Sequence, residues 1–428
     1  MFLFKTIFCR VFQAGFRAVL PILPYREPEI IASCTLLGDV CRRETLRSVL
    51  IVTDPGIVSH GLTAPVISAL ERGGIAYAVY DRTQPNPTVS NVEDALQLYR
   101  AQGCDGLIAI GGGSSMDCAK AVGARVAYPK RKLQQMKGIL RVLRRLPTLI
   151  AIPTTAGTGS EVTLAAVITD SEKHHKYALM SFPLIPRYAV LDPELTFSLP
   201  PQLTATTGMD ALTHAVEAYI GRSTTRQTRA LALEATALVF ANVKTAYTDG
   251  RNAIARENML HAAYKAGNAF SQSYVGYVHA VAHSLGGCYG TPHGLANAVI
   301  LPYVLEMYGK SAHRKLHELG VAAGVCSEVD SHAVGAEKFI QAIRQLNRDM
   351  AIPEKLPGIR REDIPTLARR AEQEANPLYP VPRLMDREEI ETIYHKIADW
   401  NAESCVTKKS APFWTGRGRS IKPARQSR

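Results

Sequence analysis

The chain has 428 residues, of which 46% are apolar and 21% charged, and its formal net charge is +12. This length is sufficient for two domains with well-buried cores. The positive charge lies at the two ends, since residues 1–26 contain four basic residues and residues 406–428 contain seven, with no acidic residue in either segment. These eleven charges leave +1 for the rest of the chain. We therefore expect no nucleic-acid partner.

Eight cysteines are scattered along the chain without a Cys-x-x-Cys motif or any paired spacing. In a chain of this size the pattern predicts free thiols in a reducing compartment, and we expect a cytoplasmic protein. Cys288 lies in a histidine-rich stretch, and we expect it to be a small core residue.

Residues 1–26 alternate large apolar residues with single basic ones, such as Lys5, Arg10 and Arg17. No apolar run approaches the ~20 residues of a membrane span. Arg10 and Arg17 also interrupt the apolar centre that a secretory signal needs. Two interpretations remain open. The segment is either a basic amphipathic helix in peripheral contact with an anionic membrane, or a helix packed on the body of the protein or on a partner subunit.

Residues 27–195 alternate short apolar strands with helices. This alternation predicts an α/β dinucleotide-binding domain with a doubly wound parallel sheet. The predicted strands cover 48–53, 75–80, 106–110 and 148–152, and the predicted helices cover 62–72, 92–102 and 115–125.

Two loops of this domain suit the phosphates of a dinucleotide. Gly111-Gly-Gly-Ser-Ser-Met-Asp117 follows a strand and precedes a helix, where glycines let the backbone approach a pyrophosphate and amide groups face its charge. Thr154-Thr-Ala-Gly-Thr-Gly-Ser160 follows a later strand. The Gly-x-Gly-x-x-Gly fingerprint is absent, so a purely structural glycine turn is the alternative.

Asp54 follows the first clear strand and precedes Pro55-Gly56. A carboxylate at this place can accept hydrogen bonds from an adenosine ribose and repels a 2′-phosphate, which favours NAD over NADP. The alternative is an ordinary aspartate in a turn.

Strand signals fade after Pro193, and residues 196–405 are predicted to form an all-helical, metal-binding domain. Its predicted helices cover 205–220, 229–247, 253–271, 278–285, 295–307, 336–349 and 387–401. Residues 406–428 are predicted to be a basic, disordered tail.

The histidines of this second half are spaced for a metal site. His279 and His283 are four residues apart and share one helical face. Gly286-Gly287 is predicted to end that helix, and Pro292 suits the start of the next one, which leaves His293 at a helix start.

Asp210 and His214 form a second pair with a spacing of four residues. One carboxylate and three histidines are a suitable ligand set for a divalent transition metal. The alternative is that each histidine is an ordinary hydrogen-bonded core residue.

Four segments carry a resemblance to a known family. They are, in chain order, Gly111-Gly-Gly-Ser-Ser-Met-Asp117, Pro153-Thr-Thr-Ala-Gly-Thr-Gly-Ser-Glu161, Thr206-Thr-Gly-Met-Asp-Ala-Leu-Thr-His-Ala-Val-Glu-Ala-Tyr219 and the stretch from His279 to Gly294. They resemble the motifs of the iron-containing (group III) alcohol dehydrogenases, in the family's order. The resemblance implies that family's fold, shared with dehydroquinate synthase.

The resemblance also implies site residues. It assigns the metal to Asp210, His214, His279 and His293, and it places His283 in the substrate site without making it a ligand. We expect His283 to relay a proton. The implied NAD contacts are Gly112, Gly113, Ser114, Thr154, Thr155 and Thr158, with Asp117 in the first loop, and less closely Asn86 and Lys176.

The activity implied is that of a metal-dependent oxidoreductase, which interconverts a small alcohol and its aldehyde or ketone by hydride transfer with NAD(H). The resemblance favours Fe(II), although Zn(II) suits the same ligands. Family likeness also suggests a homo-oligomer.

Three alternatives remain. The first is a lyase of the dehydroquinate-synthase type, whose usual carboxylate ligand is a glutamate where this chain has Asp210. The others are a zinc enzyme like glycerol dehydrogenase and a non-catalytic membrane scaffold.

Overall fold

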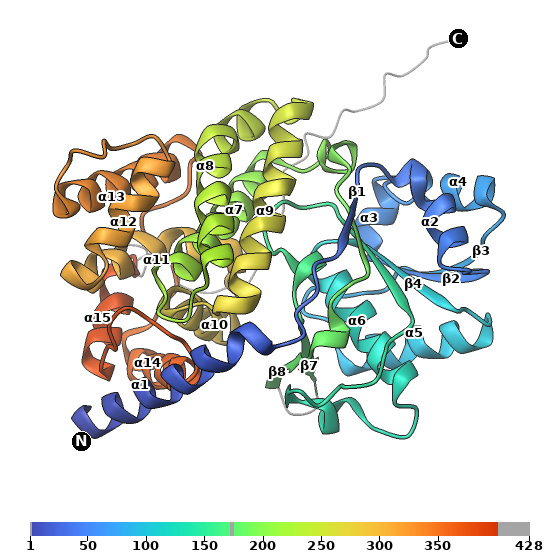
Figure 1. Ribbon diagram of the computed structural model, residues 1–428, viewed down its shortest axis with the longest axis horizontal. Helices are drawn as coiled ribbons and strands as arrows, with labels where there is room; N and C mark the ends of the chain where they lie inside the picture. The colour runs from blue at the N-terminus through green and yellow to red at the C-terminus, as the bar shows by residue number, and fades with distance from the viewer. Residues whose placement is uncertain (1, 172–174, 401–428) are drawn as a thin grey trace, which may run out of the picture.

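The computed structural model describes residues 2–171 and 175–400. The predicted tail at 406–428 lies outside the described residues. Two halves lie side by side in Figure 1, an α/β half with the sheet and a helical half. The predicted fold class is therefore confirmed.

A six-stranded parallel sheet organises the first half, with the strand order β1-β9-β6-β4-β2-β3. Alternate residues of its strands face two separate cores. Leu50 and Leu107 pack on one side with α5 (Val89–Ala101) and α6 (Gly113–Ala127). Ile51 and Ile108 pack on the other side with α2 (Leu37–Arg43) and α4 (Ala64–Gly73). Helices on both faces bury the sheet, which explains why its central strands are runs of Val, Leu and Ile. The strands are β1 (Glu29–Ile31), β2 (Ser48–Val52), β3 (Ala76–Tyr80), β4 (Gly106–Gly111), β6 (Thr148–Pro153) and β9 (Tyr188–Val190).

The helices of this half are α2 (Leu37–Arg43), α3 (Pro55–Ser59), α4 (Ala64–Gly73), α5 (Val89–Ala101) and α6 (Gly113–Ala127). A second, three-stranded sheet was not predicted. It has the order β5-β8-β7, with β5 (Gly138–Ile139), β7 (Ala165–Asp170) and β8 (His175–Met180), and β7 and β8 are antiparallel. Short 3-10 helices cover Leu20–Ile22, Cys34–Leu36, Leu133–Met136, Ser160–Val162, Phe182–Leu184, Pro193–Thr196, Gly309–Ser311 and Arg361–Asp363.

The second half is helical, and α7 runs through its centre (Figure 1). Sixteen of the twenty residues of α7 are buried, because α8, α9 and α11 cover it. Such a helix is apolar on nearly all sides, so each polar residue on it needs a specific partner. The helices are α7 (Pro201–Ile220), α8 (Arg226–Thr248), α9 (Ala253–Ser273), α10 (Tyr277–Tyr289), α11 (His293–Tyr308), α12 (His313–Ala322), α13 (His332–Asp349), α14 (Ile364–Ala375) and α15 (Arg387–Ile397).

Two local predictions were wrong. Gly286 and Gly287 do not end their helix, because α10 continues to Tyr289 and ends at Gly290, whose φ of 68° gives the left-handed cap. Cys288 is exposed instead of part of the core. Both errors have one cause, since the extra turn of helix carries Cys288 to the surface.

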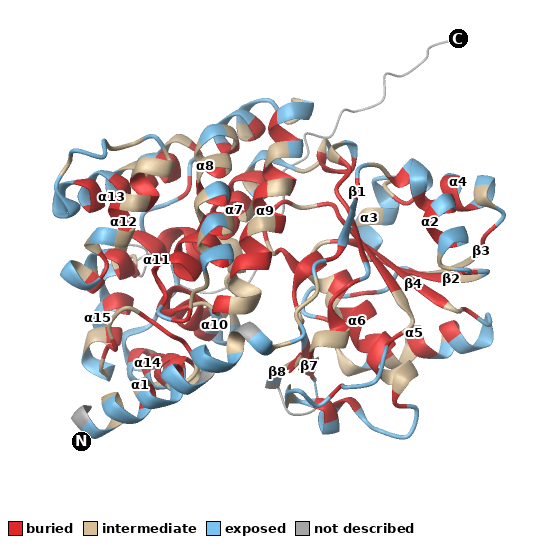
Figure 2. Cartoon of the chain, viewed as in Figure 1, coloured by how far each residue is buried: buried red, intermediate tan, exposed pale blue. Residues whose placement is uncertain are grey.

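The N-terminal segment forms α1 (Phe2–Val19), which packs along the helical half beside α14 (Figure 1). Cys9 is buried in the helical core, and Lys5 Nζ lies 2.5 Å from Glu372 Oε1. Gln13 Nε2 donates to the carbonyl oxygens of Pro377 and Tyr379. The opposite face of α1 is exposed (Figure 2). It carries large apolar side chains at Phe4, Ile7, Phe8 and Val11. Among the described residues, no helix is long and apolar enough to cross a membrane.

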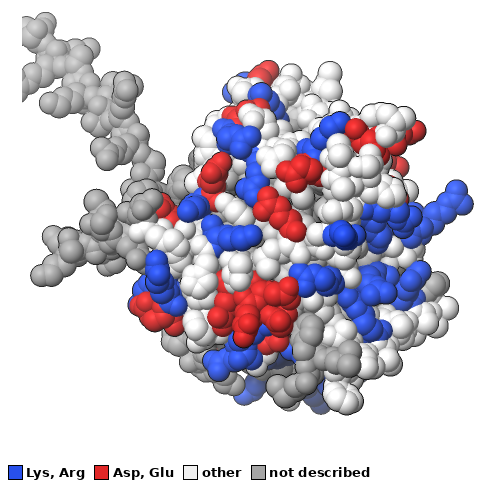
Figure 3. Space-filling model, turned by 90° about the vertical axis from the view of Figure 1, so that its left-hand side faces the viewer, with Lys and Arg blue, Asp and Glu red and all other residues white. Residues whose placement is uncertain are grey.

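Charged side chains are mixed on the surface. Seen from the end of the helical half, acidic and basic residues both occur, with one larger acidic group beside a larger basic group (Figure 3).

Candidate metal centre and cofactor loops

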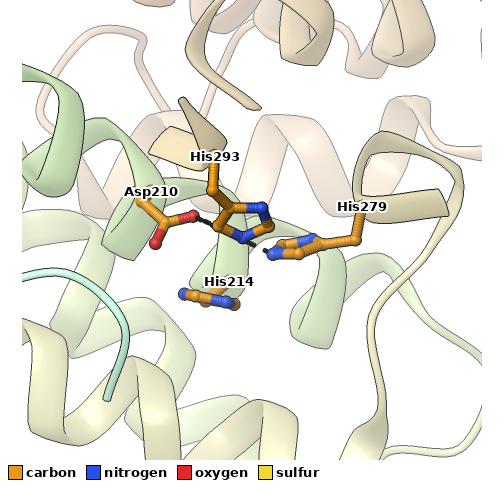
Figure 4. Close-up of side chains that lie close together, drawn as sticks. All are labelled: Asp210, His214, His279 and His293. Atoms are coloured by element: carbon orange, nitrogen blue, oxygen red, sulfur yellow. Dashed lines mark ion pairs between the residues drawn. The ribbon is translucent and has the colours of Figure 1, made fainter. Parts of the chain in front are cut away.

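Four polar side chains from three helices meet inside the helical half (Figure 4). Asp210 and His214 lie one turn apart on α7, His279 lies near the start of α10, and His293 is the first residue of α11. One potential ligand atom from each residue lies within 4.8 Å of the others. Asp210 and His279 are each only 2% exposed. The structure thus brings together the four residues that the sequence assigned to a metal.

The chemistry of this cluster fits a divalent cation. Burial lowers the pKa of His214, lowers that of His279 well below its usual range and lowers that of His293 to about 4. The three rings are therefore neutral at physiological pH, with nitrogen lone pairs available for coordination. His214 Nδ1 has no hydrogen-bond partner although it is buried. Asp210 Oδ1 lies 3.5 Å from His293 Nε2 and 3.9 Å from His279 Nε2.

A second carboxylate, that of Glu217, contacts the ring nitrogen of His279 that points away from the cluster. Glu217 Oε2 lies 2.6 Å from His279 Nδ1, and the Glu217 carboxylate accepts hydrogen bonds of 2.8 Å from the backbone N–H groups of Gly276 and Val278. This contact keeps the proton on Nδ1 and leaves Nε2 as the free donor atom for a metal. Burial raises the pKa of Glu217 to about 7.

Asn297 completes the surroundings of the four side chains. Its Nδ2 donates to Asp210 Oδ1 at 2.7 Å and lies 3.1 Å from His293 Nε2. The sequence interpretation missed Glu217 and Asn297, although their spacing offered a signal. Glu217 follows His214 by three residues and Asn297 follows His293 by four, so each shares a helical face with a predicted ligand.

His283 lies beside this cluster without joining it. Its ring stacks on His293 with a centroid distance of 5.2 Å. His283 Nδ1 lies 2.6 Å from Glu374 Oε1, which also accepts a hydrogen bond of 2.8 Å from Tyr379 Oη. Burial alone would lower the pKa of His283, but the Glu374 carboxylate outweighs it and raises that pKa. Glu374 was not predicted, because it is 91 residues away in the chain.

The two predicted cofactor loops face each other. They follow β4 and β6, which are adjacent parallel strands, so both loops lie at the same edge of the sheet. A Cβ atom at Gly113 would lie 3.2 Å from Thr158, and one at Gly112 would lie 3.7 Å from Thr155 Oγ1. Thr154 N donates to Gly111 O and ties the loops together. Gly112 precedes α6 without a side-chain cap, so the first amides of α6 are available to an anion.

Asp54 lies beside the first of these loops. Its Oδ1 accepts from the backbone N–H groups of Gly56 and Ile57 and so caps α3. Its Oδ2 accepts a 3.3 Å hydrogen bond from Ser115 Oγ. Asp54 thus has the structural role in a turn that the sequence offered as an alternative. Its Oδ2 lies next to the glycine loop through Ser115.

Asn86, Ser114 and Lys176 form a small group near the same loop. Asn86 has a φ of 59°, its backbone N–H donates to Ser114 Oγ at 3.3 Å, and its Oδ1 accepts from Lys176 Nζ at 2.8 Å. Burial lowers the pKa of Lys176.

Asp117 binds protein groups. Its Oδ1 accepts from Ser160 Oγ and its Oδ2 from the backbone N–H of Val167, both at 3.0 Å. Lys120 is buried nearby and donates to Ser160 Oγ, Thr163 Oγ1 and two backbone carbonyls. These contacts connect α6 to the second loop.

Sequence comparison identifies the family. Residues 32–193 match the family model described as "Iron-containing alcohol dehydrogenase". Residues 204–398 match the model described as "Fe-containing alcohol dehydrogenase family, C-terminal". The chain is 37% identical to a 1,3-propanediol dehydrogenase of Klebsiella pneumoniae over 89% of this chain and 98% of that relative. It is 38% identical to a lactaldehyde reductase of Escherichia coli over 78% of this chain and 88% of the relative.

Comparison with solved structures supports the same family. A crystal structure of 1,3-propanediol oxidoreductase matches with a TM-score of 0.84 and 37% identity, over 87% of this chain and 99% of the other. A sulfoacetaldehyde reductase from Bifidobacterium kashiwanohense, solved in complex with NAD+, matches with a TM-score of 0.78 and 29% identity, over 88% and 98% of the two chains. The chain belongs to the family of iron-containing alcohol dehydrogenases.

Proposed function

We propose that this enzyme interconverts a small alcohol and its aldehyde or ketone at the four-residue cluster, by hydride exchange with NAD(H). The observation that carries the proposal is the convergence of Asp210, His214, His279 and His293 on one point. These side chains would hold Fe(II), with Zn(II) as a second ion that fits the same donors. A divalent cation there supplies polarisation of the substrate oxygen, and NAD supplies hydride exchange.

Residues around the four ligands orient them and provide a group that can carry a proton. Glu217 and Asn297 fix the orientation of His279 and Asp210, so the ligand atoms are preorganised. His283 shares its Nδ1 proton with Glu374, which leaves Nε2 free to accept or return a proton. We infer that His283 relays the proton released when the alcohol is oxidised. Its stacking on His293 keeps its ring within reach of the cluster.

The glycine loops support NAD binding. We infer that Gly112, Gly113 and the first amides of α6 receive the pyrophosphate, with Thr154, Thr155 and Thr158 opposite. We infer that Asp54 accepts hydrogen bonds from the adenosine ribose, which favours NAD over NADP. The cofactor would also be contacted from one side by Asn86, Ser114 and Lys176. The role of Asp117 would be to position the two loops.

The alternative activities have less support. A lyase of the dehydroquinate-synthase type is not favoured, because the family is one of alcohol dehydrogenases and the named relatives are oxidoreductases. The scaffold hypothesis leaves the convergence of four ligands unexplained.

We further propose a cytoplasmic homo-oligomer. Seven cysteines among the described residues are free, which suits a reducing compartment. The exposed apolar face of α1 and the edge strand β1 are surfaces that a second copy could cover. Peripheral membrane contact through α1 stays a prediction, but Lys5 contacts the body of the protein instead of facing outward. Co-flotation with anionic vesicles tests it, and equal behaviour of the chain without its first 24 residues would contradict it.

The proposed reaction is tested by NADH oxidation with propanal, butanal and lactaldehyde. We expect consumption of one NADH for each alcohol formed, and loss of turnover in Asp210→Ala. No consumption with any aldehyde by metal-loaded protein would overturn the proposal.

A further inference from the structure

Two polar side chains of α1, Arg10 and Gln13, contact one segment of the helical half. Gln13 is only 4% exposed, and a buried amide needs hydrogen-bond partners to offset the loss of water. Gln13 Oε1 accepts from Arg10 Nη1 at 2.8 Å, and Gln13 Nε2 donates to two backbone carbonyl oxygens of the segment. The polar groups of Gln13 are therefore all used between α1 and this segment.

The segment, residues 376–386, connects α14 to α15 and forms neither helix nor strand. Four of its carbonyl oxygens accept hydrogen bonds from Gln13 or from the guanidinium group of Arg10. These acceptors belong to Pro377, Tyr379, Val381 and Pro382, at 3.1, 2.8, 2.8 and 3.1 Å. Because backbone carbonyls in such a segment lack the partners of regular structure, side chains of α1 supply them.

Tyr379 connects this segment to His283. Its backbone carbonyl accepts from Gln13, and its Oη donates to Glu374 Oε1 at 2.8 Å. The same oxygen of Glu374 lies 2.6 Å from His283 Nδ1, and the ring of His283 stacks on His293. The contacts of α1 thus lead through one tyrosine to the side chain beside the four-residue cluster.

A second contact joins α1 to the helix that carries Glu374. The two helices lie side by side in Figure 1, and Lys5 Nζ lies 2.5 Å from Glu372 Oε1 on α14. Glu374 is therefore supported from α1 both along its own helix and through Tyr379.

We propose that α1 positions the pair of His283 and Glu374, and that Gln13 and Arg10 are positioning residues that act through Tyr379. This inference rests on the proposed function, because His283 has the role of proton carrier there. A proton carrier works only when supporting hydrogen bonds hold it in place, and small displacements slow the transfer. Residues 2–19 lie outside the two segments that match the family models, 32–193 and 204–398.

Gln13→Met tests the proposal. Methionine is unbranched and similar in length to glutamine, but it donates no hydrogen bond, so the carbonyls of Pro377 and Tyr379 lose their partner. The matched control is Gln341→Met, the same change at an exposed glutamine of α13. Unfolding in denaturant and metal content are measured for both variants, so that only folded, metal-loaded enzyme is compared.

A single turnover of NADH oxidation with propanal is followed by stopped flow, because product release can mask a slower proton transfer in kcat. We expect Gln13→Met to slow this turnover about fivefold, the factor that corresponds to one net hydrogen bond. The solvent deuterium isotope effect should increase, and the KM for NADH should stay unchanged. Gln341→Met should behave like the wild type.

A double variant shows whether Gln13 acts through Tyr379. Tyr379→Phe removes the hydroxyl that contacts Glu374, so Gln13→Met should slow the turnover little further in this background. Equal losses from Gln13→Met in the presence and absence of that hydroxyl would overturn the proposal. An unchanged turnover rate and isotope effect in Gln13→Met alone would also overturn it.

Hydrogen exchange separates this inference from the proposed reaction. Amide exchange of residues 376–386, measured by mass spectrometry, should be faster in Gln13→Met than in the wild type. Faster exchange, together with no turnover of propanal, butanal or lactaldehyde by the metal-loaded wild type, would support the contact between α1 and this segment and contradict the proposed reaction. Equal exchange in the two proteins would overturn the inference whether or not an aldehyde is reduced.

Discussion

The Glu217 carboxylate lies 2.6 Å from Nδ1 of His279, and both side chains are buried. A carboxylate in this position fixes the tautomer and the ring orientation of a metal-binding histidine. Glu217 is held in turn by the backbone N–H groups of Gly276 and Val278, at the start of the helix that carries His279. The orientation of one ligand is thus built into the junction between α7 and α10.

We predict that Glu217→Gln weakens metal binding roughly 10- to 100-fold, as loss of such a partner does in other metal sites. The amide is nearly isosteric but uncharged, and its NH2 group would face one of the N–H donors that the two carboxylate oxygens now accept from. Metal content after dialysis against graded chelator checks this prediction. Glu234→Gln is the control, because Glu234 is an exposed glutamate on α8 paired with Lys265. Unchanged metal affinity in Glu217→Gln would contradict the role of Glu217.

His283→Gln should retain its metal and lose about 10²-fold or more in kcat, the usual contribution of a positioned proton carrier. Stopped-flow kinetics and metal analysis on the same sample check this. A full rate in the metal-loaded variant would remove His283 from the mechanism.

Glu374→Gln should lower kcat by roughly tenfold, with the KM for NADH unchanged, because the Nδ1 proton of His283 then faces a neutral acceptor in place of a charged one. Glu374→Asp should recover part of the rate. Tyr379→Phe is compared with Glu374→Gln, because it removes the hydrogen bond from Tyr379 Oη to Glu374 and keeps the Glu374 carboxylate. If Glu374→Gln raises the KM for NADH and leaves kcat intact, Glu374 does not position His283.

Asp54→Asn should relax the preference for NAD over NADP by roughly tenfold, because it removes a negative charge near the expected 2′-phosphate. Asparagine caps a helix about as well as aspartate, so the turn at α3 should persist. The measurement is kcat/KM for NADH and for NADPH with one aldehyde. An unchanged ratio would leave Asp54 with its capping role alone.

Lys120→Met should destabilise the protein by about 3 kcal/mol or more, because the oxygen atoms that surround the buried ammonium group would lose its hydrogen bonds. Denaturant unfolding compares it with Lys130→Met, a substitution at an exposed lysine. Equal unfolding free energies for the two variants would show that Lys120 does not hold α6 against the second loop.

The periodicity of the chain was sufficient to predict the main architecture. The central strands β2, β4 and β6 are buried on both faces, so their apolar runs stand out in the sequence, and long helices such as α7 follow directly from their pattern. The edge strand β1, its three-residue neighbour β9 and the small sheet of β5, β7 and β8 were missed. These strands are short, half-exposed or mixed in composition, and their pairing depends on segments far apart in the chain.

The site was predictable where its spacing is local. The pairs Asp210–His214 and His279–His283 each share a helical face, but no spacing within one helix reveals that α7, α10 and α11 bring their residues together. Glu374 and the inward contacts of α1 depend on tertiary packing alone. Gly286 and Gly287 misled the prediction because a helix that is buried on one side tolerates glycine in its interior.

Metal removal and reloading tests the central claim most directly. The protein is purified without oxygen, stripped of metal, titrated with Fe(II) or Zn(II), and assayed for NADH oxidation with propanal. We predict that turnover is lost with the metal and returns at one equivalent of metal per chain, and that Asp210→Ala and His214→Ala bind less metal and show no recovery. Full turnover of propanal by the stripped protein would contradict the account. So would the absence of turnover when one equivalent of Fe(II) is bound and also when one equivalent of Zn(II) is bound.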